Sequence, residues 1–233
     1  MKEYTMSNIL VTETNSAAVV EQSLMAFAAG IKAQTRSDIL HSYQFASRVA
    51  SKQFPTKEQS EEWYKRALEV MEDLGWLTIR RTYEREHSES QSLTLGSIAF
   101  KAMKAVGQAA FGGPVSEALG KLAGDALESL GSITEPQEVL KRNLEERETG
   151  SIGLVTCLEN SEGEVLMLLT AVSTDGMEKN TDTLVFEWKN TGAYSYSGAA
   201  LLSFNTEHYA RVREDVATRL GDLTRKNVSE YEI

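Results

Sequence analysis

Cysteine is almost absent from this chain of 233 residues, because Cys157 is the single one. An intramolecular disulfide is therefore excluded, and a chain of this length has to be held together by a hydrophobic core. A secretory signal is also missing, since residues 1–16 show neither a charged segment before an apolar run nor a small-residue cleavage site. We expect a cytoplasmic protein, or one exported without a cleaved signal peptide.

Basic residues are in short supply. The chain carries 24 Lys and Arg against 34 Asp and Glu, which gives a net charge of −10. Binding to nucleic acid requires clustered Lys and Arg, so nucleic acid is not an expected partner. The densest basic cluster is Arg80, Arg81 and Arg85, and Glu84 and Glu86 dilute it.

Signatures of catalysis are lacking as well. The three histidines, His41, His87 and His208, fall at no metal-ligand spacing, and no Walker A sequence, dinucleotide fingerprint or nucleophile elbow is present. Cys157 and His208 form the one nucleophile and base pair that can be assembled. Cys157 lies among apolar strand residues, however, a setting typical of an inert buried thiol. We therefore expect no enzymatic activity, no catalytic residue, no metal and no cofactor.

The region 1–149 shows mainly helical patterning. Its predicted helices span about residues 16–34, 35–53, 56–74 and 135–147, with a strand over 76–84. The third helix begins with a capping signal, because Gln59 follows Thr56 at the spacing of a capping box. In the strand, Leu77, Ile79 and Tyr83 alternate with polar residues.

A stretch rich in alanine and glycine, residues 93–131, occupies the centre of the chain. Its spacing predicts two helices, over about 96–111 and 115–130, separated by Gly112-Gly113-Pro114. Ser116, Gly120 and Gly124 recur every four residues, a row of small side chains that favours close approach of another helix. The apolar and small residues expected to pack this hairpin are Phe100, Met103, Val106, Phe111, Leu119, Gly120, Leu122 and Gly124.

Two interpretations of this hairpin stay open. It forms the centre of a soluble core, or it leaves the fold and enters a membrane. In composition it resembles the apolar hairpins of helical pore-forming toxins of bacteria. Each helix is about 16 residues, roughly 24 Å, whereas a resident transmembrane helix needs about 20 apolar residues. Length and the charges of Lys101, Lys104, Lys121 and Asp125 favour the soluble core.

From residue 150 onward the pattern indicates β-structure. Strands are predicted over 152–158, 164–174, 183–189 and 193–204, and a last helix follows from Asn205 or Thr206 to about Leu223. Asn190-Thr191-Gly192 is a strong hairpin turn, so the last two strands are expected to pair with each other. The short connections favour a four-stranded antiparallel meander covered by the last helix.

The sequence thus predicts an α+β protein with a helical region 1–149 and a β region 150–233, in one shared core or in two domains. Trp188, Tyr194 and Tyr196 form a predicted aromatic patch, a composition enriched at protein interfaces. The expected function is non-enzymatic binding to a protein partner or to itself. The alternative is a membrane-active toxin or virulence effector that uses residues 96–130.

Overall fold

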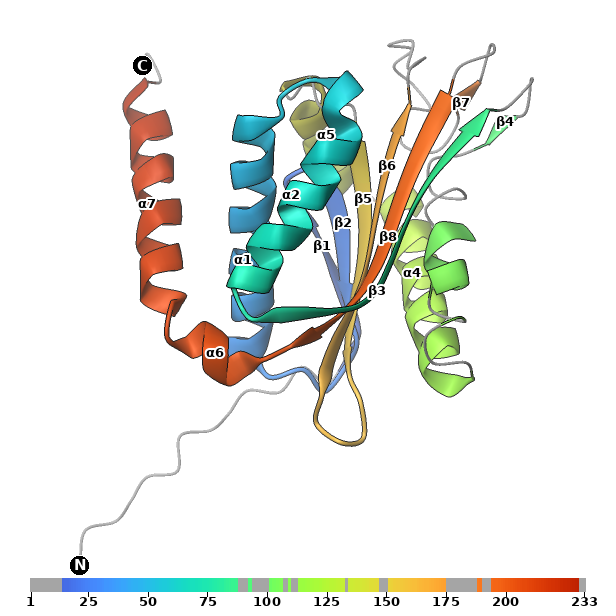
Figure 1. Cartoon of the computed structure of the whole chain (residues 1–233), viewed down its shortest axis with the longest axis horizontal. Helices are drawn as coiled ribbons and strands as arrows, with labels where there is room; N and C mark the ends of the chain where they lie inside the picture. The colour runs from blue at the N-terminus through green and yellow to red at the C-terminus, as the bar shows by residue number, and fades with distance from the viewer. Residues whose placement is uncertain are drawn as a thin grey trace, which may run out of the picture.

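A six-stranded sheet lies between two layers of helices in the computed structural model (Figure 1). The structure describes residues 14–87, 92–93, 101–106, 109, 113–132, 134–146, 151–174, 188–189 and 194–230. The strands are β1 (Ser16–Val20), β2 (Ser23–Phe27), β5 (Ser151–Glu159), β6 (Val165–Thr174), β8 (Tyr194–Phe204) and β3 (Trp76–His87), in that spatial order. The fold is therefore α+β, as the sequence predicts.

One pair of neighbouring strands in this sheet is parallel. β2 runs parallel to β5, with Leu24 opposite Leu154 and Phe27 opposite Cys157, while the other neighbouring pairs are antiparallel. The pairing joins the two ends of the region between them, because α1, α2, β3, α4 and α5 all lie between β2 and β5 in sequence. Strands from residues 1–149 and from residues 150–233 thus belong to one sheet.

The prediction of a helix over residues 16–34 is wrong, because this segment is the hairpin of β1 and β2. All five residues of β2 are buried, since β1 and β5 flank the strand and helices cover both faces. A strand buried on both faces is apolar without alternation, so its residues also satisfy a helical spacing. The β-branched pair Val19 and Val20 is the local feature that favours a strand.

The predicted four-stranded meander is also wrong. β5, β6 and β8 do form consecutive antiparallel pairs, but the sheet is mixed and has six strands. The strand expected over 183–189 is described as β7 (Trp188–Lys189), which pairs with β4 (Ser92–Leu93) in a separate two-stranded sheet. The described part of β7 is therefore not paired with β8, its expected neighbour across the Asn190 turn.

One helical layer covers the sheet with α1 (Ala33–Gln53), α2 (Ser60–Asp73), α6 (Thr206–Ala210) and α7 (Arg213–Glu230); the short η1 (Lys57–Gln59) precedes α2. Its core, called here the first core, includes Ile39, Leu68 and Met71 from the helices and Met25, Phe27, Val155, Met167 and Leu202 from the sheet. At two predicted helix starts, the side chains singled out from the sequence make hydrogen bonds to the backbone. The Gln59 side chain accepts from the Thr56 backbone N–H at 3.4 Å, and Asn205 caps α6 by accepting from the His208 N–H at 2.9 Å.

The opposite layer contains α4 (Pro114–Ser132), α5 (Thr134–Glu146) and helical residues 101–106. They enclose a second core of Met103, Val106, Leu119, Leu122, Leu140, Leu154, Leu166, Leu168 and Leu201, among others. Met103, Val106, Leu119 and Leu122 are buried as predicted, while Phe100 and Phe111 lie outside the described residues. Within the described residues, no helix combines the length and apolar composition that crossing a bilayer requires.

The predicted close contact along the small-residue row of α4 is not found among the described residues. A Cβ atom added at Gly120 or at Gly124 meets no heavy atom within 4 Å. Both glycines are partly exposed, while Ser116 is buried. α4 therefore packs on the sheet through Leu119 and Leu122, and not through its glycines.

Leu119→Ala is expected to lower the free energy of unfolding by about 2–5 kcal/mol, the usual cost of deleting a packed leucine. Gly120→Ala is expected to leave it unchanged or raise it by up to about 1 kcal/mol, because alanine is the better helix former and space is open. Urea denaturation measures both. A loss of more than 1 kcal/mol at Gly120 would contradict the open environment of that position.

Candidate functional site

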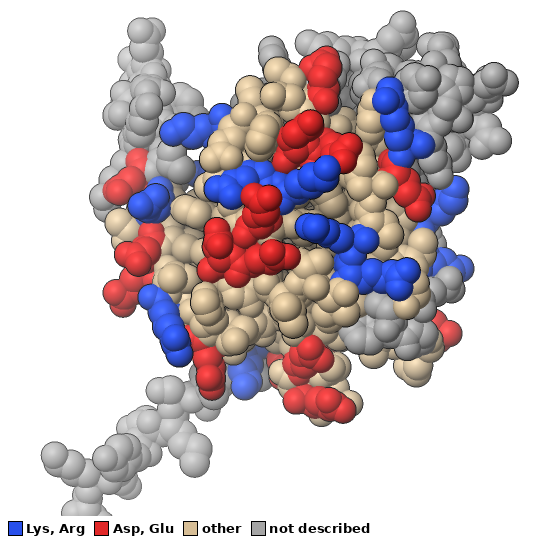
Figure 2. Space-filling model, in the orientation of Figure 1, with Lys and Arg blue, Asp and Glu red and all other residues tan. Residues whose placement is uncertain are grey.

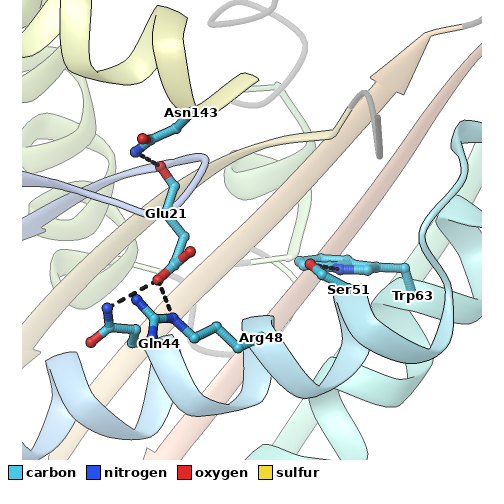
Figure 3. Close-up of polar contacts among 6 residues, drawn as sticks. All are labelled: Glu21, Gln44, Arg48, Ser51, Trp63 and Asn143. Carbon is cyan, nitrogen blue, oxygen red and sulfur yellow. Dashed lines mark hydrogen bonds and ion pairs between the residues drawn. The ribbon is translucent and has the colours of Figure 1, made fainter. Parts of the chain in front are cut away.

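Glu21, in the turn between β1 and β2, connects both helical layers to the sheet (Figure 3). Its carboxylate accepts from Arg48 Nε at 2.8 Å and from Gln44 Nε2 at 3.0 Å, and both donors lie on α1. Its backbone carbonyl accepts from Asn143 Nδ2 of α5 at 2.5 Å. One turn residue thus contacts a helix of the first core and a helix of the second.

The backbone of Glu21 is unusual, with a φ of 54° in the left-handed region that is costly for residues other than glycine. The side chain is 5% exposed, so its charge is compensated by Arg48 and not by water. This geometry is typical of a structural clamp, because charged and amide groups satisfy one another and leave no group facing an open site. We interpret the Glu21 cluster as a stabilising element.

A second ion pair, whose carboxylate is buried, connects α7 to α1. Arg213 donates from Nε and Nη2 to the two carboxylate oxygens of Asp38 at 2.8 and 2.7 Å, a bidentate arrangement. Gln34 donates to the same carboxylate at 2.9 Å. The hydrogen bonds that Arg213 donates to the Asp38 carboxylate raise the pKa of Arg213, which therefore stays charged. Asp38 is almost completely buried and fully paired, so this cluster is structural too.

The surface that stands out lies on β3, the terminal strand of the sheet. Leu77 is 68% and Ile79 is 43% exposed, and these are the exposed large hydrophobic residues in the described part of the chain. Arg80, Arg81 and Arg85 on the same strand are exposed as well. We call these five residues the β3 surface.

A β-bulge explains why Leu77 and Ile79 are exposed. The pairing of β3 with β8 shifts between Thr78 and Arg80, so that Ile79 is an extra residue. Trp76, before the bulge, and Tyr83, after it, both face the first core although an odd number of positions separates them. An inserted residue reverses the alternation of a strand, which moves Leu77 away from the face that Tyr83 occupies.

Aromatic rings continue the β3 surface toward α2. Tyr83 lies between Tyr64 of α2 and Tyr196 of β8, with ring centroids 5.9 and 6.2 Å away. The Arg85 guanidinium lies 4.8 Å above the centroid of the Tyr196 ring, a cation–π contact. Gly198 makes room for this arrangement, because a Cβ there would lie 2.8 Å from the Tyr64 ring.

The tyrosine hydroxyls are protonated at neutral pH. Burial raises the pKa of Tyr83 to about 12, against a lowering by its hydrogen bond with Ser60, which has a length of 3.4 Å. Burial also raises the pKa of Tyr64, and its hydroxyl has no hydrogen-bond partner among the described residues. The Tyr64 and Tyr83 hydroxyls are therefore neutral, and the ring contacts described for these residues are packing contacts.

The sequence-predicted aromatic patch is placed in part. Tyr196 belongs to the ring cluster beside the β3 surface, whereas the side chains of Trp188 and Tyr194 lie outside the described residues. Sequence reasoning did not identify Leu77 and Ile79 as exposed or Tyr83 as part of the ring cluster. Their one local signal is the Arg80-Arg81 pair, because adjacent charges interrupt the alternation of a half-buried strand.

Cys157 and His208, the one nucleophile and base that the sequence could combine, differ in burial. Cys157 is completely buried in the first core, and burial raises the pKa of its thiol, so the reactive thiolate is suppressed. His208 is exposed, and its Nε2 lies 3.3 Å from the backbone oxygen of Asp73. Among the described residues, no group of His, Cys, Asp and Glu is arranged to hold a metal ion.

Replacement of Glu21 tests the clamp. Glu21→Ala should lower the free energy of unfolding by about 2–4 kcal/mol, because it removes two hydrogen bonds to the buried carboxylate and keeps a side chain at positive φ. Glu21→Gly should cost less, since glycine accepts this φ. Asn143→Ala should cost about 1 kcal/mol by removing the bond to α5 alone.

Glu72→Ala, at an exposed position of α2, is the control and should change stability by no more than about 0.5 kcal/mol. Urea denaturation followed by far-ultraviolet circular dichroism measures all four variants. Equal stability of Glu21→Ala and the control would show that the clamp contributes nothing.

Comparison with known proteins finds little. The chain matches no family model and no curated protein sequence. Among solved structures, a delta-endotoxin is similar over 88% of this chain and 89% of its own, with 12% identity and a TM-score of 0.37. The Evf virulence factor is similar over 92% and 85%, with 13% identity and a TM-score of 0.30. The structural neighbours of this chain thus include an endotoxin and a virulence factor at weak similarity, and we draw no functional inference from likenesses of this strength.

Proposed function

We propose that this protein is a non-enzymatic binding protein whose β3 edge takes up an extended segment of another protein as an additional strand. The observation that carries the proposal is the exposure of Leu77 and Ile79, at 68% and 43%, on the terminal strand of the sheet. In strand addition an extended segment pairs with an exposed sheet edge; backbone hydrogen bonds supply affinity and side-chain contacts supply specificity.

The length and regularity of β3 support this proposal. β3 is 12 residues long, and in the described part of the chain β8 is its one strand partner. From Arg80 to His87 the pairing with β8 is regular, without a further register shift. A terminal strand presents backbone N–H and C=O groups outward, so this stretch offers a regular template for the backbone hydrogen bonds that strand addition uses.

The opposite edge of the sheet is less suited to this role. β1 has five residues, against 12 in β3, and α5 packs against it. The Glu21 turn at its end is further fixed by Asn143 of α5. Of the two edges, β3 is therefore the one that combines length, apolar exposure and charge.

Selection from a phage-displayed random peptide library tests the proposal. We expect selected peptides to bind at β3 and to compete with one another. Leu77→Ala and Ile79→Ala should each weaken binding about fivefold or more, the effect of truncating an interface anchor. Thr218→Ala, at an exposed position of α7, is the control and should leave binding unchanged.

N-methylation of the peptide separates strand addition from docking of side chains alone. Alternate amides of a strand point toward its neighbour, so the odd-numbered and the even-numbered amides of the peptide form two sets. Methylation of the set that points toward β3 should abolish binding, and methylation of the other set should not. The proposal would be refuted if neither set of methyl groups reduces the affinity of the peptide, or if the Leu77 and Ile79 variants bind it as well as the original protein does. If β3 instead pairs with a second copy of itself, light scattering would detect dimers, and the Leu77 and Ile79 variants would be monomeric.

Membrane activity through residues 96–130 is the alternative function, and its test is dye release from liposomes. The buried apolar residues described in this segment belong to the second core, as at Val106 and Leu119. With these residues in the core, we expect no dye release between pH 5 and 8, a range chosen because histidine ionises near pH 6.5. Release that increases when Leu119→Ala loosens the segment would instead support membrane insertion.

A further inference from the structure

The arginines of the β3 surface indicate the chemistry of the segment that this edge takes up. Arg80, Arg81 and Arg85 are exposed on one strand of a chain whose net charge is −10. Figure 2 shows Lys and Arg side chains gathered along the course that β3 follows in Figure 1, with acidic side chains between them. The edge is therefore locally basic within an acidic protein.

Two of these arginines share one face of the strand. Arg81 is opposite Ala200 and Arg85 is opposite Tyr196, and Tyr83, between them, is opposite Gly198. Residues directly opposite each other project to the same side of a sheet, and Ala200 belongs to the first core. Arg81, Tyr83 and Arg85 thus form a row on the face that α2 covers.

Arg80 and the acidic residue of this stretch lie on the other face. Arg80 is opposite Leu201, which belongs to the second core, and Arg80 Nη1 donates to the Ala109 backbone oxygen at 3.3 Å. Glu84 is opposite Ser197 and therefore projects to the same side as Arg80. The carboxylate of Glu84 consequently projects away from the Arg81 and Arg85 row. On the side of the row, the charges of Glu61 and Glu62 of α2 act on Tyr83, and Glu61 is itself paired with Lys65 at 2.6 Å.

We propose, on the basis of the strand addition proposed above, that the segment bound at β3 carries acidic residues at positions i and i+4 and an apolar residue at i+2. A strand added to the β3 edge places alternate residues opposite Arg81, Tyr83 and Arg85, because side chains alternate with a period of two. Opposite charges on directly paired positions stabilise a sheet, and an aliphatic residue packs well on an aromatic ring.

The Arg85 position is already shaped for this role. Its guanidinium rests on the Tyr196 ring at 4.8 Å, which limits the freedom that binding would otherwise remove. A second copy of this chain is the less favourable occupant, since it brings the same arginines to the edge and a further net charge of −10. An acidic segment of another protein brings no arginines of its own, so its charge is complementary to that of the β3 arginines.

A synthetic peptide with the core Glu-Thr-Val-Thr-Glu is the probe. An NMR titration that follows the β3 amides should show binding at this strand. The affinities of the matched peptides Gln-Thr-Val-Thr-Gln and Lys-Thr-Val-Thr-Lys should be lower by a factor of about ten or more. The first peptide loses two cross-strand ion pairs, and the second reverses their charge. A peptide of the same composition with adjacent glutamates, Glu-Glu-Val-Thr-Thr, should also be weaker, because one carboxylate then projects to the other face.

Charge exchange provides the decisive variant. The double variant Arg81→Glu/Arg85→Glu should lose affinity for the glutamate peptide and gain affinity for the lysine peptide. Arg219→Glu, an exposed charge reversal on α7, is the control and should keep the original preference. The single variants Arg81→Gln and Arg85→Gln give the same comparison with less change in charge if the double variant does not fold.

The outcomes distinguish this inference from the proposed function. Equal binding of the glutamate, glutamine and lysine peptides would overturn the acidic pattern and leave strand addition standing. An absence of binding by peptides of every charge would overturn both. Vesicles of phosphatidylcholine and phosphatidylserine serve as a further arm. Binding to these vesicles that Arg81→Glu/Arg85→Glu abolishes, together with no peptide binding, would overturn the inference in favour of an anionic membrane surface.

Discussion

The parallel pairing of β2 with β5 is the interaction on which the rest of this fold depends. β2 brings the N-terminal hairpin into the centre of the sheet, beside a strand more than 120 residues away in sequence, with Ser23 opposite Gly153. A Cβ at position 153 would lie 2.0 Å from Ser23 Oγ, so glycine is required for this approach. The Ser23 hydroxyl in turn hydrogen-bonds to the Tyr43 hydroxyl, which fixes α1 above the same point.

The two helical layers follow from this arrangement of strands. Because β2, β5 and β6 are apolar on both sides, their residues divide between the cores. Val155 and Met167 face the first core, and Leu154 and Leu168 face the second. A sheet with two apolar faces has to be covered on both, so the helices between β2 and β5 are shared between them. The Glu21 turn then connects the layers at a point where packing alone cannot, by hydrogen bonds to α1 and to α5.

The helices that contain strong local signals could be predicted from the sequence. The start of α6 at Asn205 and the helical periodicity of α1, α2 and α5 are properties of short windows of sequence, which neighbours in space do not alter. The hairpin of β1 and β2 could not be predicted in this way. Its strand character comes from partners distant in sequence, and burial on both faces removes the alternation that identifies a strand.

The candidate site shows the same limit at the scale of single residues. The sequence identifies Tyr196 as a candidate aromatic contact. It does not identify its neighbours Tyr83 and Arg85, because they belong to a strand more than 100 residues away. The exposure of Leu77 depends on one inserted residue at Ile79, and a bulge of this kind is set by the pairing with β8 and not by a local motif.

Protection of an edge strand and recognition by that strand use the same chemistry. Charged side chains and a bulge are the usual means by which a terminal strand avoids pairing with copies of itself, and β3 has both. Protection alone, however, favours polar residues along the whole edge, whereas β3 keeps Leu77 and Ile79 in contact with solvent. Protection also does not require two arginines in one row with a tyrosine between them. Like charges on the arginines disfavour a second copy of β3, and under the proposed strand addition the same side chains would select a segment of opposite charge.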